Sequence, residues 1–162
     1  MKIPYLFKIN KKPEADNEYG LPKKSVPNSI IKYHGLEGDF NHFRNLKKFN
    51  DPDMAIMLLS IDILDDLNKE GWPVKPGDLG ENLTLKNIQY SDLKPNQKYK
   101  IGTVELQISI ICAPCSKLQI LDYIGPAKKN IFIKTLINRR GWYARVLKEG
   151  KIQTGDSLES FK

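Results

Sequence analysis

The sequence predicts a mainly β or α+β domain, rich in β-barrel structure, with two or three helices. This prediction depends on many short apolar segments, on the turn sequences between them, and on one segment with helical periodicity. The turn sequences include "PGDLG", "KPNQ" and "KEGK", in which Gly, Pro and Asn favour chain reversal. The segments expected to be strands are residues 5–9, 29–33, 55–59, 98–101, 104–111, 143–147 and 157–161.

Two segments are expected to be helical. Between residues 60 and 70 the apolar residues recur at helical spacing, with aspartates on the other side. Ser60 is placed to begin this helix, and Gly71 to end it. A second helix is expected over residues 127–138, although "NIFIKTLI" within it also fits a strand.

Length and composition limit the classes of protein. The 162 residues fit one domain, 1–162, and their 40% hydrophobic and 28% charged content is typical of globular proteins. No apolar run approaches the roughly 18 residues of a membrane span, and the N-terminus lacks the features of a secretory signal. We therefore expect a cytoplasmic protein with no membrane partner. The two cysteines are too few for a disulfide scaffold.

The net charge of +7 raises the question of an anionic partner. The lysines are scattered along the chain, and no nucleic-acid-binding motif accompanies them. We therefore expect no nucleic-acid partner. A small anionic ligand, or simply a solvated surface, explains the charge better.

Both cysteines lie in "ICAPCSKL", at the end of the expected strand 104–111. This pattern fits a redox pair, half of a metal site, a single reactive thiolate, or two buried cysteines. Cys112 continues the strand, where a free cysteine is commonly a small buried hydrophobe. Pro114 fixes the local turn, so Cys115 is the candidate for chemistry.

Three further segments carry candidate site residues. "HGLEGDFNHFR" presents Asp39 and His42, which either contact a ligand or belong to a polar turn. "PGDLGENLTL" places Glu81 and Asn82 beside a glycine turn, which either binds an anion or only satisfies a hairpin. "NRRGWYAR" brings two guanidinium groups, Arg139 and Arg140, to a turn, where they bind phosphate or are solvated.

Taken together and in this order, these segments resemble the MOSC family, the domain found at the C-terminus of molybdenum cofactor sulfurases. The resemblance covers about residues 20–158 and is that of a stand-alone MOSC protein. The matching segments are "GLPKKSV", "GLEGDFNH", "LLSIDILDDLNKEGWPVKPGDLGENLTL", "IGTVELQIS…CAPCSKL" and "RRGWYARVLKEGKIQTGD". One departure is "FRNLKKFNDPD", residues 43–53, where many stand-alone relatives have a glycine- and histidine-rich stretch.

The resemblance implies a β-barrel-rich fold and a molybdenum–pterin cofactor (molybdopterin). It implies that Cys115 coordinates molybdenum or carries sulfur, and thiolate is a reasonable soft ligand for such a centre. It further implies that Asp39, His42, Glu81 and Asn82 line the pocket. The candidates for the pterin phosphate are Lys24, Arg139 and Arg140.

Two functions follow from the resemblance. The first is a molybdenum-dependent reductase of small N-hydroxylated compounds, with Asp39, Glu81 or His42 as the acid and a separate reductase as electron donor. The second is a sulfur or cofactor carrier without turnover, in which Cys115 holds a persulfide and Cys112 resolves it as a disulfide. The carrier requires a separate cysteine desulfurase, and pyridoxal phosphate would enter only through that sulfurase partner.

Overall fold

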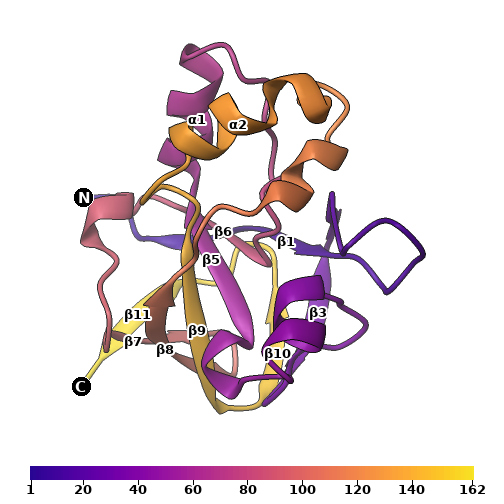
Figure 1. Cartoon of the computed structure of the whole chain (residues 1–162). Helices are drawn as coiled ribbons and strands as arrows, with labels where there is room; N and C mark the ends of the chain where they lie inside the picture. Colours follow the sequence, from indigo (N-terminus) through magenta and orange to yellow (C-terminus); the bar gives the residue numbers. More distant parts are fainter.

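An eight-stranded sheet dominates the computed structural model, which describes all residues 1–162 (Figure 1). The order across the sheet is β11-β7-β8-β9-β5-β6-β1-β2, and all neighbours are antiparallel except β5 and β6. Its strands are β1 Tyr5–Lys11, β2 Lys24–Val26, β5 Ile56–Ser60, β6 Leu83–Lys86, β7 Lys98–Ile101, β8 Val104–Ile111, β9 Trp142–Lys148 and β11 Leu158–Phe161.

Burial along the strands follows from their sequences. In β8 the side chains of Val104, Leu106 and Ile108 are buried and alternate with more exposed residues, as the two-residue period of a strand requires. All five residues of β5 are buried, because this strand lies in the interior of the sheet between β9 and β6. A cluster of 19 buried hydrophobic residues forms the main core.

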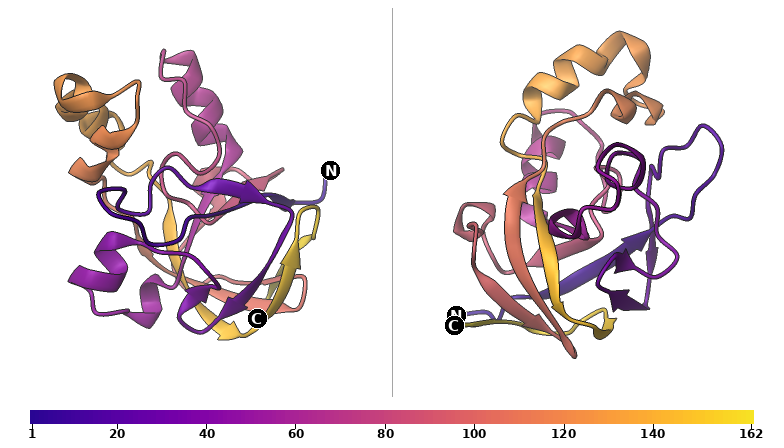
Figure 2. Two further views of the ribbon diagram at one scale, coloured as in Figure 1. Left: turned by 90° about the vertical axis from the view of Figure 1, so that its right-hand side faces the viewer. Right: turned by 60° about the horizontal axis from the view of Figure 1, so that its bottom comes forward.

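A smaller sheet and two α-helices complete the architecture. The three-stranded sheet has the order β10-β3-β4, with β3 Asn28–Lys32, β4 Gly35–Leu36 and β10 Gly150–Gln153. The helices α1 Ile61–Lys69 and α2 Gly125–Thr135 lie together beyond one end of the large sheet, and Figure 2 shows this from two further sides. A second core cluster of 12 residues, including Leu64 and Phe132, packs in this helical part.

Four short helical segments connect these elements. One is a π-helix, η1 Phe43–Lys47, and three are 3-10 helices, η2 Pro52–Met54, η3 Tyr90–Asp92 and η4 Ser116–Ile120. In Figure 1, η1 and η4 lie on the same side of the molecule, one below the other. The polypeptide between β8 and η4 contains both cysteines.

The mainly β, α+β class predicted from the sequence is confirmed, with one difference in detail. The end strands β11 and β2 do not pair with each other, so the eight-stranded sheet is not closed into a barrel. The helix expected over 60–70 is α1, and the ambiguous segment 127–138 is helical as α2. None of the helices is long and apolar enough to cross a membrane.

Candidate functional site: a thiol in a cationic cavity

The two cysteines have different surroundings, although only two residues separate them. Cys112 is buried and packs against Met54, Met57 and Tyr143. Cys115 is partly exposed and lines a cavity of about 160 Å³. Both are free thiols. The backbone N–H of Lys117 lies 3.5 Å from Cys115 Sγ and donates to it, which orients the thiol.

The cavity is formed by segments that are far apart in the sequence. They are the loop before β2, the approach to η1, the connection from β8 to η4, and the start of β9. The residues lining it are Tyr19, Gly20, Leu21, Lys23, Asn41, His42, Phe43, Ala113, Pro114, Cys115, Lys117, Arg140 and Tyr143. Lys23, Lys117 and Arg140 carry positive charge and no carboxylate is among the lining residues, so the lining is cationic.

Lys23 is the most buried cation of the lining. Its ammonium donates to Asp39 Oδ1 at 2.7 Å and to the carbonyl of Phe40 at 2.9 Å. Burial lowers the pKa of Lys23 from its usual value, although the nearby Asp39 opposes this shift. An ammonium has three N–H donors, so one remains for a ligand.

Arg140 and Lys117 are the other Lys and Arg side chains of the lining. Arg140 donates from Nη1 to the carbonyl of Ala113 at 2.9 Å and from Nε to that of Leu79 at 3.2 Å. Its Nη2 has no hydrogen-bond acceptor within the protein. Lys117 Nζ lies 4.2 Å from the ring centre of Tyr19, a cation–π contact.

His42 and Tyr143 are two further titratable side chains of the lining. Burial lowers the pKa of His42, and the positive charges of Lys117 and Lys47 lower it further. Burial and the neighbouring Cys112 raise the pKa of Tyr143, so its phenol stays protonated at neutral pH.

A buried polar layer lies behind Lys23. The carboxylate of Asp39 is fully buried and also accepts from the backbone N–H of Lys12 at 3.0 Å and from Asn82 Nδ2 at 2.9 Å. Asn82 Oδ1 in turn accepts from the backbone N–H of Met57 at 3.0 Å. Asn82 therefore joins β5 to the segment that holds Lys23.

Glu81 belongs to the same layer. Its Oε1 accepts from the backbone N–H of Gly77 at 2.8 Å and from Thr84 Oγ1 at 3.0 Å, whereas its buried Oε2 has no partner. Burial raises the pKa of Glu81 to about 7. Gly77 has a φ of 92°, and a Cβ there would collide with the carbonyl of Lys23. This glycine therefore allows the "PGDLG" turn to pack against the backbone of Lys23, whose N–H donates to Gly77 O at 3.0 Å.

The structure divides the residues predicted from the sequence into three groups. Cys115, His42 and Arg140 line the cavity together. Asp39, Glu81 and Asn82 are buried one layer behind it and are not part of the lining. Lys24 is exposed on β2, and Arg139 forms an ion pair with Glu70 at 2.8 Å, so neither lines the cavity.

Sequence reasoning missed Lys23, Lys117, Tyr19 and Tyr143 as lining residues. Lys23 and Lys117 do lie inside the motifs "GLPKKSV" and "CAPCSKL". Lys23 precedes Lys24 directly, and nothing in the alternation of so short a strand shows which of the two faces inward. Tyr143 follows "RRGW", where its apolar ring was assigned to a strand.

The side chains of the chain offer few ligands for a metal ion. The chain has no group of three or more His, Cys, Asp or Glu side chains that could hold a metal ion. Cys115 is therefore the only thiol available to a metal in the cavity, and a metal bound there needs its other ligands from a cofactor. The cations around the thiol fit an anionic cofactor, so the residues present are compatible with a molybdenum–pterin.

The fold and the cavity define a class of protein: a mainly β, α+β chain with one accessible thiol among cations. The family profile of the MOSC domain matches residues 39–159. The chain belongs to the MOSC family, which is associated with the molybdenum cofactor. No curated protein matches the chain closely enough to count as a relative.

Solved structures share this fold over nearly the whole chain. The YuaD protein from Bacillus subtilis superposes with a TM-score of 0.80 at 18% identity, covering 98% of this chain and 96% of YuaD. YiiM from Geobacillus stearothermophilus gives a TM-score of 0.71 at 26% identity, with 98% and 75% covered. YiiM from Escherichia coli gives 0.70 at 20% identity, with 99% and 71% covered.

Proposed function

We propose that this MOSC protein binds a molybdenum–pterin cofactor with Cys115 as the protein ligand to the metal and reduces small N-hydroxylated compounds. One observation carries the proposal: a partly exposed thiol lines a cavity that also contains Lys23, Lys117 and Arg140. A soft thiolate suits the metal, and the cations suit the phosphate of the pterin.

The phosphate role is assigned to Lys23, Lys117 and Arg140. Lys23 has one free N–H, and Arg140 has a free Nη2. Lys24 and Arg139, which were predicted for this role together with Arg140, lie outside the cavity. A charged donor that is already held by protein contacts loses little side-chain freedom on binding an anion.

The bound molybdenum would supply the two electrons that an N–O bond takes up on reduction to an amine and water. The chain must supply or relay two protons for this reaction. His42 is the candidate to relay these protons, because it alone of the three predicted acids lines the cavity. Its lowered pKa disfavours a standing imidazolium and favours quick release of each proton it takes up. Asp39 instead holds Lys23 in position. The electrons come from a separate donor protein, since the sequence has no flavin or iron–sulfur motif.

The contact from the Lys117 backbone to Cys115 Sγ also supports the carrier function. In this alternative, a pyridoxal-phosphate-dependent cysteine desulfurase transfers sulfur to Cys115, and the N–H donated to Sγ orients the sulfur atom that accepts it. Cys112 would have to leave its buried position to resolve the persulfide. Mass spectrometry of the chain after incubation with a desulfurase and cysteine tests this, because a persulfide adds one sulfur atom to Cys115.

The test of the proposed function is the molybdenum content of the protein purified from a host that makes the cofactor. We expect near-stoichiometric molybdenum in the wild type and in Cys112→Ala, and at least about a tenfold loss in Cys115→Ala, because second-layer changes at metal sites already cost about 10–100-fold in affinity. The loaded wild type should then reduce benzamidoxime with reduced methyl viologen. Equal metal in both cysteine variants, or no turnover by the loaded protein, would contradict the proposal.

A further inference from the structure

An exposed apolar and basic segment borders the cavity on the η1 side. We call residues 43–49 the rim. Its apolar side chains are exposed to solvent: Phe43 by 43%, Leu46 by 52% and Phe49 by 86%. Phe43 also lines the cavity. A partner bound to the rim would therefore sit at the entrance to Cys115.

The rim is held in a fixed conformation. Asn41 Oδ1 accepts from the backbone N–H of Arg44 at 2.9 Å, and Asn45 Oδ1 accepts from the N–H of Asn41 at 2.7 Å. Arg44 is buried and donates to the carbonyl of Ala55 at 2.7 Å. These contacts preorganise the segment, and preorganisation lowers the entropic cost of binding.

The backbone also places Phe49 outward at an energetic cost. Its φ is 51°, in the left-handed region that bulky residues rarely adopt. Strained backbone conformations tend to cluster at ligand sites and switch regions. The chain thus uses an unfavourable backbone conformation to expose a large apolar side chain beside its site.

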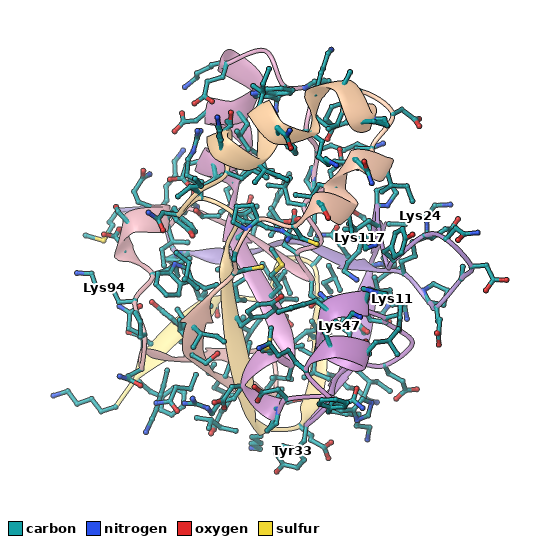
Figure 3. All side chains as sticks on the ribbon, in the orientation of Figure 1. Lys11, Lys24, Tyr33, Lys47, Lys94 and Lys117 are labelled. Atoms are coloured by element: carbon teal, nitrogen blue, oxygen red, sulfur yellow. The ribbon has the colours of Figure 1, made fainter.

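The surface around the rim is basic. No acidic residue occurs between Asp39 and Asp51, and Lys47 and Lys48 lie within the rim. Figure 3 shows Lys11, Lys24, Lys47 and Lys117 on the same side of the molecule, whereas Lys94 lies on the opposite side. None of the lysines Lys11, Lys24, Lys47, Lys48 and Lys117 is in an ion pair.

We propose that the rim docks an acidic electron-donor protein, whose apolar centre covers Phe49 and Leu46 while its carboxylates face the surrounding lysines. This inference rests on the proposed reductase function. A small anion would use the lysines but leave the apolar side chains exposed, whereas a protein interface needs both an apolar centre and a charged periphery. The rim also lacks the long amphipathic face by which interfacial helices bind lipid.

The probes are two small acidic donors, a flavodoxin and a [2Fe–2S] ferredoxin. The rim variant is Leu46→Ser/Lys48→Glu/Phe49→Ser, which leaves Phe43, Arg44 and Lys47 unchanged. The control is Ile131→Ser/Lys128→Glu/Ile137→Ser, since Ile131 and Ile137 are 62% and 57% exposed near α2, away from the cavity. The two triple variants remove the same kinds of side chain.

Direct binding is measured first, by calorimetry with the reduced and oxidised probes. We expect at least one probe to bind the wild type and the control alike and the rim variant at least about tenfold more weakly, because a few residues near the centre of an interface carry most of its binding energy. Binding should also weaken as salt is raised. No binding of either probe to the wild type, or equal binding by the rim variant, would overturn the inference.

Turnover then separates this inference from the proposed function. Reduced methyl viologen needs no docking, so the loaded rim variant should match the wild type with viologen and fall behind it with the protein donor. No turnover with viologen in the wild type would contradict the reductase function itself. Phosphatidylserine vesicles serve as a third probe. If the rim variant loses binding to these vesicles but binds both donor proteins as the wild type does, the rim is a lipid surface and the docking proposal is wrong.

Discussion

The wall and the rim of the cavity differ in whether their charged side chains are buried or exposed to solvent. By the wall we mean Lys23 of the lining together with Asp39 and Asn82 in the layer behind it. The wall buries an ion pair, between Lys23 and Asp39, whose side chains are 1% and 0% exposed. The rim, residues 43–49, exposes its lysines and its apolar side chains to solvent. Arg44 connects the two, because its guanidinium lies 3.8 Å from Asp39 Oδ2.

This difference in burial determines which substitutions each region can tolerate. A buried charge is stable only with its partner, so a single substitution in the wall leaves another group unpaired. The outward side chains of the rim have no such partners, and their removal should affect binding rather than folding. The wall therefore fixes the geometry of the site, and the rim is free to determine what approaches it.

The largest effect on stability should come from Asp39→Ala. It leaves the Lys23 ammonium buried without its carboxylate and also removes one of the two acceptors of Asn82 Nδ2. Breaking a buried pair by removing one partner typically costs about 3–5 kcal/mol. We expect a loss of this size in the free energy of unfolding, measured by urea denaturation with circular dichroism.

The matched control removes both charges. Asp39→Ala combined with Lys23→Met should recover part of the lost stability, because Lys23 then no longer leaves an unpaired charge beside the missing carboxylate, whereas the buried Arg44 loses Asp39 in both variants. Anion binding should not recover, since Lys23 lines the cavity. If the single Asp39 variant is as stable as the wild type, Lys23 is not held by this carboxylate as described.

A smaller effect, dependent on pH, should come from Glu81. Burial raises its pKa from 4.5 to about 7 in the folded chain. Protonation therefore favours the fold, and this contribution is lost as the pH rises from 4.5 through about 7. At about 1.4 kcal/mol per pKa unit, the loss is on the order of 3 kcal/mol.

Glu81→Gln tests this directly, because it has no proton to lose. The difference in unfolding free energy between wild type and variant should change across pH 4.5–8, with the wild type losing more stability. Asp78, whose pKa burial also raises, is present in both proteins and cancels in the comparison. A constant difference would mean that Glu81 does not titrate in this range.

Sequence reasoning identified the fold and the central thiol, because both depend on local patterns. The position of Cys112 at the end of a strand and of Cys115 after Pro114 distinguished the two cysteines. The spacing of apolar residues predicted α1 correctly. It did not separate lining residues from supporting ones. Asp39 and Asn82 belong to motifs of the site, yet their side chains accept from backbone N–H groups that are distant in the sequence, those of Lys12 and Met57. Those contacts exist only after the sheet has assembled.

The smallest expected changes in the free energy of unfolding come from the adjacent residues Arg139 and Arg140. They compare an exposed charge with a buried one. The ion pair of Arg139 with Glu70 is partly solvent-exposed at both side chains, and such pairs contribute only about 0–1 kcal/mol. Arg139→Ala should therefore change the free energy of unfolding by less than about 1 kcal/mol and leave the metal content unchanged. Arg140→Ala, in contrast, leaves the buried carbonyl of Leu79 without a donor, at about 1–3 kcal/mol for a buried group left unsatisfied, and removes the guanidinium donor of the Ala113 carbonyl. Because Ala113 lies two residues before Cys115, the Arg140 variant should also lose bound molybdenum. Equal metal content and stability in the two variants would mean that Arg140 neither supports the cysteine turn nor holds the cofactor.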